Sequence, residues 1–214
     1  MLRRLGVTQA AKRVWTGYSR ALSTQPVLTK TTTGVVIYSC GDVVMQKMER
    51  DSLKEDANVT EGKEAASSWD SYRTLRMCTY GGLWLGPFLH VWYRGLEQLF
   101  VGRAGPLVMV GKLLLDQSMA APANMVAFYV IQGKMQNHSW LEVSNVLQER
   151  LWPTMCSLWT LWVPVQFINL TFVPLDKRVL VVNIVGVAWS MIMSKFGSQV
   201  KAAPIQMDVV DWDA

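Results

Sequence analysis

The feature that most restricts the fold of this chain is a stretch, 151–175, that contains no Asp, Glu, Lys or Arg. A helix of a soluble bundle needs a polar face, and this stretch offers only Gln166, Asn169 and a few hydroxyl groups for one. Together with this stretch, four others carry few charges, and the five candidate spans are 27–46, 77–93, 112–133, 151–175 and 179–194. In a bilayer, backbone polar groups must pair internally, so apolar runs of this length form helices. The sequence therefore predicts an all-α fold, an integral membrane bundle of four to five hydrophobic helices.

Prolines interrupt several of these predicted helices. The prolines concerned are Pro122, Pro153, Pro164 and Pro174. Proline removes a backbone donor and clashes with the preceding turn, so one straight helix is not expected over 151–175. The stretch 27–46 is the weakest candidate span, because Lys30 and Asp42 lie inside it. A soluble helical bundle with an unusually apolar core is the alternative to the membrane bundle.

Charge divides the chain into three regions. Residues 1–26 carry basic side chains and no Asp or Glu, which is typical of a mitochondrial targeting segment and also of a flank that orients the first membrane helix. Residues 27–195 form the predicted membrane domain, which contains a polar loop, 47–76, and an amphipathic interfacial segment, 134–150. The tail, 196–214, is polar, and we expect it to be disordered.

The sequence lacks the arrangements that support catalysis or metal binding. Cys40, Cys78 and Cys156 lie far apart, and none belongs to a Cys/His cluster. His90 and His138 have no nucleophile or carboxylate arranged beside them, and no phosphate-binding glycine motif occurs. We therefore expect no enzyme activity, no cofactor and no metal. Because the excess positive charge is confined to the N-terminal region, no direct nucleic-acid binding is expected either.

Polar side chains inside the predicted spans are the candidate functional residues. They are Asp42, Asp116, Gln117, Gln166 and Asn169. A carboxylate in hydrocarbon costs about 3 kcal/mol, so such groups face the interior of a bundle, a partner or water. They can line a polar conduit, or they can pair with Lys30, Lys112 or Arg178 and hold the helices together. Lys112 precedes Asp116 by one helical turn, which favours pairing for that carboxylate.

Four blocks of residues, in order along most of the chain, resemble one family. The residues that carry the resemblance are Trp15, Tyr18, Pro26, Gly41, Arg76, Gly86, Pro87, Trp92, Tyr93, Trp162, Val173, Pro174, Arg178 and Trp189. Together they make the chain similar to the Mpv-17/peroxisomal membrane protein 2 family. The chain departs from the family pattern at Trp162-Val163-Pro164, where a Trp-Pro step is usual, and at Asn169-Leu170, where Asn-Phe is usual.

The resemblance implies a protein of the mitochondrial inner membrane or of the peroxisomal membrane, and the basic N-terminus favours the mitochondrion. It also implies a channel-like protein that passes small solutes and supports mitochondrial membrane homeostasis and mitochondrial DNA maintenance. The alternative is a non-conducting membrane scaffold or assembly factor that recruits matrix partners such as ribosome or nucleoid components. The expected partners are thus the lipid bilayer, further copies of the chain and mitochondrial proteins.

Overall fold

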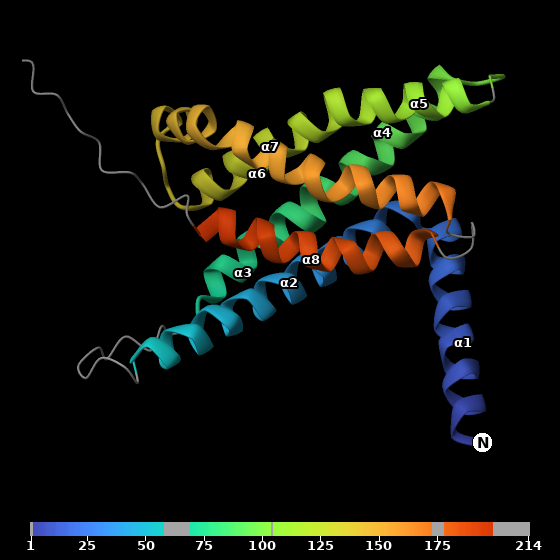
Figure 1. The fold of residues 1–214 in the computed structure, drawn as a ribbon, viewed down its shortest axis with the longest axis horizontal. Helices are drawn as coiled ribbons and strands as arrows, with labels where there is room; N and C mark the ends of the chain where they lie inside the picture. The colour runs from blue at the N-terminus through green and yellow to red at the C-terminus, as the bar shows by residue number, and fades with distance from the viewer. Residues whose placement is uncertain (1, 58–68, 104, 173–177, 199–214) are drawn as a thin grey trace, which may run out of the picture.

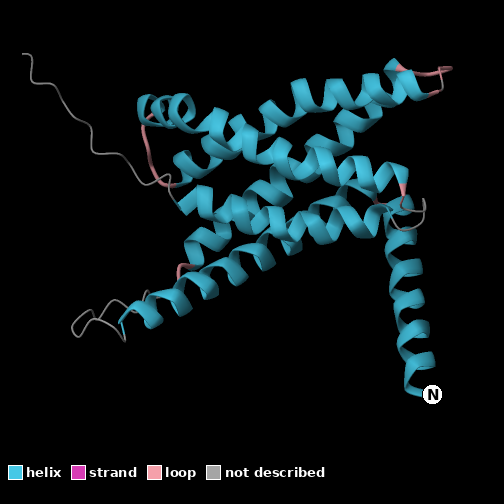
Figure 2. Cartoon of the chain, viewed as in Figure 1, coloured by secondary structure: helices cyan, strands magenta, loops and turns pink. Residues whose placement is uncertain are grey.

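The computed structural model of the chain describes residues 2–57, 69–103, 105–172 and 178–198. Over these ranges the regular structure is helical throughout, with no strand, and the helices gather into one bundle (Figures 1 and 2). The all-α prediction is confirmed. Within the same ranges, no single helix is both long enough and apolar enough to cross a membrane.

Helix α2, Pro26–Ala57, is the element against which much of the bundle packs. A proline suits the first position, because its fixed φ matches a helix and its missing N–H would have no partner there. The preceding helix α1, Leu2–Thr24, projects away from the bundle (Figure 1). The structure differs from the predicted polar loop over 47–76, since α2 continues to Ala57 and a new helix begins at Ser71.

Two continuous helical rods follow, and each contains a π-helical segment in which the turn is wider than in an α-helix. The parts are α3 (Ser71–Cys78), η1 (Thr79–Leu85) and α4 (Gly86–Leu99), then α5 (Pro106–Leu115), η2 (Asp116–Ala120) and α6 (Ala121–Met135). Asp70 begins the first rod, because its carboxylate accepts the backbone N–H of Arg73 at 2.8 Å. Between the rods, Gly102 and Gly105 adopt φ values of 74° and 121°, which glycine tolerates without a steric cost.

Helix α7, Trp140–Thr171, begins at a capping box. The Ser139 hydroxyl accepts the backbone N–H of Glu142 at 3.2 Å, and the Glu142 carboxylate accepts the backbone N–H of Ser139 at 2.6 Å. The helix continues through Pro153 and Pro164, so the two elements predicted over 134–150 and 151–175 are largely one helix. Each proline removes only one backbone hydrogen bond, and the capped start supports the turns before it.

Helix α8, Arg178–Ser198, packs along α2 and against α7. It continues past 195, the end of the predicted membrane domain, so the first residues of the predicted disordered tail are helical. The rest of that tail, 199–214, lies outside the described residues.

Glycines let α2 approach its neighbours closely. A Cβ at Gly34 would lie 2.1 Å from the carbonyl oxygen of Gly81, and one at Gly41 would lie 1.8 Å from the Ser190 hydroxyl oxygen. These contacts join α2 to η1 and to α8. No side chain larger than hydrogen fits at either position without displacing a helix, as is common between membrane helices.

Candidate functional site

A cavity of about 230 Å³ lies in the bundle and is lined by residues of α2, α4, α6, α7, α8 and both π-helical segments. Aromatic and aliphatic side chains form most of its wall. The aromatic residues that line it are Tyr38, Tyr80, Tyr93, Trp162 and Trp189. Its polar side chains other than tyrosine and tryptophan are Asp116, Gln117, Asn124 and Gln166. The cavity therefore combines a mostly apolar wall with a few polar groups, which is the usual composition of a small-molecule site.

Asp116 is the acidic residue of this wall. Its carboxylate accepts the indole N–H of Trp92 at 3.0 Å and the amide N–H of Gln117 at 3.0 Å. The expected pairing with Lys112 is wrong, because the Lys112 ammonium binds Glu97 at 2.7 Å instead. Among the described residues, no Lys or Arg forms an ion pair with Asp116.

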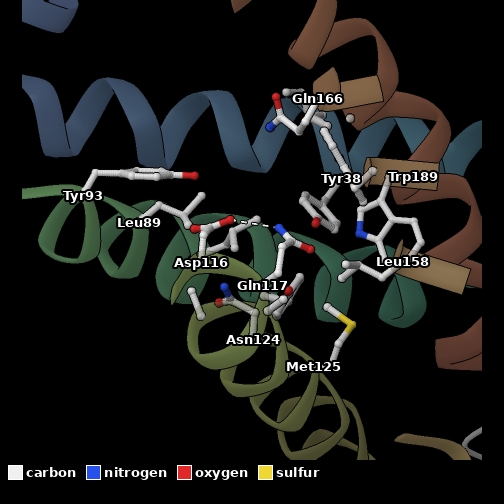
Figure 3. Close-up of a pocket in the computed structure, with 17 residues that line it drawn as sticks. Tyr38, Leu89, Tyr93, Asp116, Gln117, Asn124, Met125, Leu158, Gln166 and Trp189 are labelled. Carbon is white, nitrogen blue, oxygen red and sulfur yellow. Dashed lines mark hydrogen bonds between the residues drawn. The ribbon is translucent and has the colours of Figure 1, made fainter. Parts of the chain in front are cut away.

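The amide groups of the wall have different surroundings. Asn124 Oδ1 accepts the indole N–H of Trp84 at 3.0 Å, which fixes the orientation of that amide. Gln117 Oε1 is buried and has no hydrogen-bond partner among the described residues. Figure 3 shows Asp116 and Gln117 side by side, with Tyr93 beyond the carboxylate and Trp189 beyond the amide. The Gln117 Oε1 atom is thus an acceptor without a partner among the described residues, and it lies next to Asp116 in the cavity wall.

A second polar cluster joins α2, α3 and α8 outside the cavity. The Asp42 side chain is 0% exposed, and its Oδ1 lies 2.9 Å from Arg73 Nε. The Ser194 hydroxyl donates to the same oxygen at 2.6 Å, while Arg73 donates to the Ser194 oxygen at 2.6 Å. The other face of the guanidinium binds Glu49 at 2.6 Å. The positive charge of Arg73 is therefore compensated by two carboxylates, and its guanidinium also donates to a hydroxyl oxygen.

The second oxygen of Asp42 is held by one side chain of α2 and one of α3. Gln46 Nε2 donates to Oδ2 at 2.8 Å, and the Thr74 hydroxyl donates to it at 2.5 Å. Gln46 also accepts the backbone N–H of Asp70 at 2.9 Å and donates to the carbonyl of that residue at 3.0 Å. The cluster thereby ties the end of α2 to the beginning of α3, and it satisfies every polar atom of the Asp42 carboxylate.

The structure places the predicted site residues in two separate locations. Asp116, Gln117 and Gln166 meet in one cavity, whereas Asp42 pairs away from it. The partner that the described residues show for Asp42 is Arg73 on α3, which was not among the partners expected from the sequence. The side chain of Asn169 lies outside the described part of the structure.

Sequence comparisons with known proteins identify relatives of this chain. Protein SYM1 of Mycosarcoma maydis is 31% identical over 164 residues, which span 76% of this chain and 75% of that protein. A model described as the Mpv17 / PMP22 family matches residues 133–194. The chain belongs to the Mpv17 / PMP22 family.

Further Mpv17 / PMP22 relatives match almost the whole chain. Peroxisomal membrane protein 2 of Bos taurus is 28% identical over 90% of this chain and 93% of the bovine protein. Protein sym-1 of Neurospora crassa is 29% identical over 85% of this chain and 98% of the fungal protein. No solved structure matches the chain.

Several residues that carry the family resemblance have clear packing or cavity positions. Tyr93, Trp162 and Trp189 line the cavity. Trp92 holds Asp116 through its indole N–H. Arg76 donates to Gln132 Oε1 at 3.1 Å.

The remaining family residues lie at helix starts and contacts or beyond the described side chains. Gly86 begins α4, and a Cβ there would lie 2.9 Å from Thr31 Cα. Pro87 follows it in the first turn of α4, as Pro26 begins α2. Trp15 and Tyr18 lie on α1 with ring centroids 6.2 Å apart. Val173, Pro174 and the Arg178 side chain lie outside the described part.

Sequence reasoning missed the side chains that complete the second cluster. Gln46, Arg73, Thr74 and Ser194 hold Asp42, but none of the four was predicted as a site residue. The spacing of Arg73 and Arg76 was the available signal, because basic residues three apart share one face of a helix. No cluster of His, Cys, Asp and Glu that could hold a metal ion occurs in the described ranges.

Proposed function

We propose that this chain is a multi-pass protein of an organelle membrane, mitochondrial or peroxisomal, that passes small solutes through its central cavity. The single observation that carries the proposal is the cavity itself, which lies between the long helices and contains Asp116, Gln117, Asn124 and Gln166. A space of about 230 Å³ with a few polar groups accommodates a small molecule and offers it hydrogen bonds along an otherwise apolar route.

The distribution of polar and apolar side chains supports the membrane part of the proposal. Charged and amide groups such as Asp42, Arg73 and Gln132 are buried inside the bundle. Large apolar side chains lie on its outside, where Leu107 is 87% and Phe172 is 72% exposed. A water-soluble bundle would place these two classes the other way round, and large exposed apolar areas mark contact with a partner or a membrane.

Helix length also fits a bilayer. At 1.5 Å per residue, the rod over 106–135 is about 45 Å long, more than the roughly 30 Å of a hydrocarbon core. Polar residues divide the apolar runs within these helices. Those that are buried, such as Asp42 and Gln132, face the interior of the bundle and form hydrogen bonds there. The basic helix α1 and the family resemblance favour mitochondria, and the name of the bovine relative supports the peroxisomal membrane as the alternative.

Solute flux through liposomes tests the proposal. Purified protein is reconstituted, and osmotic swelling is followed with small neutral polyols outside the vesicles. Gly186 lines the cavity, and a Cβ there would meet only the Ile37 methyl group, at 3.9 Å. Gly186→Phe should therefore fill the space and slow the swelling at least several-fold.

The matched control is Gly95→Phe, because a Cβ at Gly95 would have no atom within 4 Å and the residue does not line the cavity. This variant should swell like the wild type. Vesicles that never swell, or an equal effect of both variants, would contradict the proposal and favour the non-conducting scaffold. Under the scaffold interpretation, cavity variants change only stability or partner capture.

A further inference from the structure

The cavity has an unusual charge balance for a place inside a helical bundle. Asp116 is the acidic group of its wall, and no Lys, Arg or His belongs to the described lining. The cation one turn away, Lys112, is held by Glu97 at 2.7 Å and lies 6.0 Å from the centroid of the Phe100 ring. The carboxylate therefore lines the cavity without a neutralising cationic partner among the described residues.

Aromatic rings line the same cavity as that charge. Five lining residues are aromatic, namely Tyr38, Tyr80, Tyr93, Trp162 and Trp189. The face of such a ring carries partial negative charge and attracts a cation within about 6 Å, most strongly where water is excluded. One carboxylate with several aromatic faces is an environment that favours a weakly hydrated cation and disfavours an anion.

The hydrogen-bonding groups narrow the ligand class. Gln117 Oε1 is buried, lacks a partner among the described residues and lies in the cavity wall, so it can accept an N–H or O–H from a ligand. An inorganic ion such as Mg²⁺ or Ca²⁺ needs six or more oxygen ligands and usually several carboxylates among them, whereas the described lining contains one carboxylate, that of Asp116. An alkylammonium ion has apolar groups that suit the rest of the wall.

We propose that the cavity binds small organic cations of the alkylammonium class, with Asp116 as counter-ion, the aromatic side chains around the ammonium group and Gln117 as acceptor for a hydroxyl or N–H. This inference rests on the proposed function, because it names the class of solute that the same cavity takes.

The test compares two molecules of one shape, choline and its uncharged isostere 3,3-dimethylbutan-1-ol. Isothermal titration calorimetry on the full-length protein in nanodiscs should show choline binding at least about tenfold more tightly than the isostere, as a desolvated cation–aromatic contact and a counter-ion together predict. Equal binding of both molecules, or no binding of choline, would overturn the assignment without any variant being needed.

Two variants assign the effect to the cavity. Asp116→Asn should weaken choline binding about tenfold and leave the isostere unchanged. Glu149→Gln removes a carboxylate that is 66% exposed on α7 and absent from the cavity wall, so it should change neither affinity. Thermal unfolding of each variant shows that it is folded. If the Asp116→Asn variant binds choline as tightly as the wild type, Asp116 is not the counter-ion.

Failure of this inference is distinguishable from failure of the proposed function. If polyols pass through wild-type liposomes but choline does not bind better than its isostere, the solute path is supported and the assignment to organic cations is wrong. Choline binding without any flux would leave the binding site standing and remove conduction.

Discussion

Asp42 and Arg73 depend on one another, because each is a charge that the bundle removes from water. Loss of one partner from a buried ion pair costs about 3–5 kcal/mol, since the other charge stays buried without compensation. Arg73→Met should therefore lower the free energy of unfolding by about that amount, measured by denaturant titration in detergent.

The exposed pair between Lys112 and Glu97 provides the comparison for Arg73→Met. Glu97 is 74% exposed, and Glu97→Gln should cost no more than about 1 kcal/mol. The double variant Asp42→Asn/Arg73→Gln should recover part of the loss caused by Arg73→Met, because it leaves no unpaired charge at the fully buried position 42, while Glu49, which also loses Arg73, is 34% exposed. Equal stability of Arg73→Met and Glu97→Gln would show that the buried pair is not structural.

Glycines that look alike in the sequence should respond differently to alanine. At Gly34 an added methyl group would lie 2.1 Å from the carbonyl oxygen of Gly81, so Gly34→Ala should separate α2 from η1 and cost about 1–3 kcal/mol. At Gly186 the same group would make an ordinary contact of 3.9 Å with Ile37. Gly186→Ala should therefore leave the melting temperature unchanged or raise it slightly, and a large fall would contradict the packing described.

At this scale the sequence indicates which polar residues face inward but not which partners they meet. Asp116, Gln117 and Gln166 could be predicted as interior residues from their place in apolar stretches. The partner of Asp42 could not be, because Arg73 becomes its neighbour only when α3 packs against α2. The spacing of one helical turn suggested that Lys112 pairs with Asp116. In the structure Lys112 instead forms an ion pair with Glu97 on α4.

Among the elements, the start of α7 carries a dependence on pH. The pKa of Glu142 is lowered by the hydrogen bond from the backbone N–H of Ser139, and further by the Ser139 hydroxyl. A carboxyl whose pKa is lower in the folded state adds stability above its ordinary pKa, and loses it as the pH falls through the folded value. The protection factors for hydrogen exchange in the first turn of α7, which correct for the intrinsic rate, should therefore fall as the pH falls through that window.

Variants of the capping box separate its two hydrogen bonds. Ser139→Ala should destabilise the start of α7 by about 1 kcal/mol at neutral pH. Glu142→Gln should remove the pH dependence, while Glu149→Gln on the same helix should keep it. A pH response that survives Glu142→Gln would assign the effect to another group.

The positions of the helices follow from the sequence, but several of their ends do not. Four of the five predicted spans lie inside a helix or rod, and the fifth, 151–175, lies in α7 as far as Thr171, because apolar stretches of that length are helical in any folded context that buries them. Helix α2 extends to Ala57 through a highly charged segment, since charged residues with long side chains are good helix formers. The wide turns η1 and η2 had no sequence signal, because packing between rods decides where a helix takes up an extra residue.

For the whole molecule, the apolar exterior leads to a prediction about extraction. Leu83, Leu107 and Phe172 are each more than 70% exposed, and lipid would cover them. Alkaline carbonate should therefore leave the tagged protein in the organelle pellet, while a soluble matrix marker and a peripheral membrane marker are released. Recovery of the chain in the supernatant as a detergent-free monomer would contradict both the membrane assignment and the solute path.

The wide turn η2 also determines where a one-residue deletion in the second rod would preserve the fold. Ser118 is exposed within η2, and its deletion would leave one ordinary α-helical turn with α5 and α6 still facing their present neighbours. Deletion of the exposed Val126, inside α6, would instead turn everything after it by about 100° around the helix axis. Gln132 would then point away from Arg76, so two deletions of one residue each, only two turns apart, should have opposite outcomes for the fold.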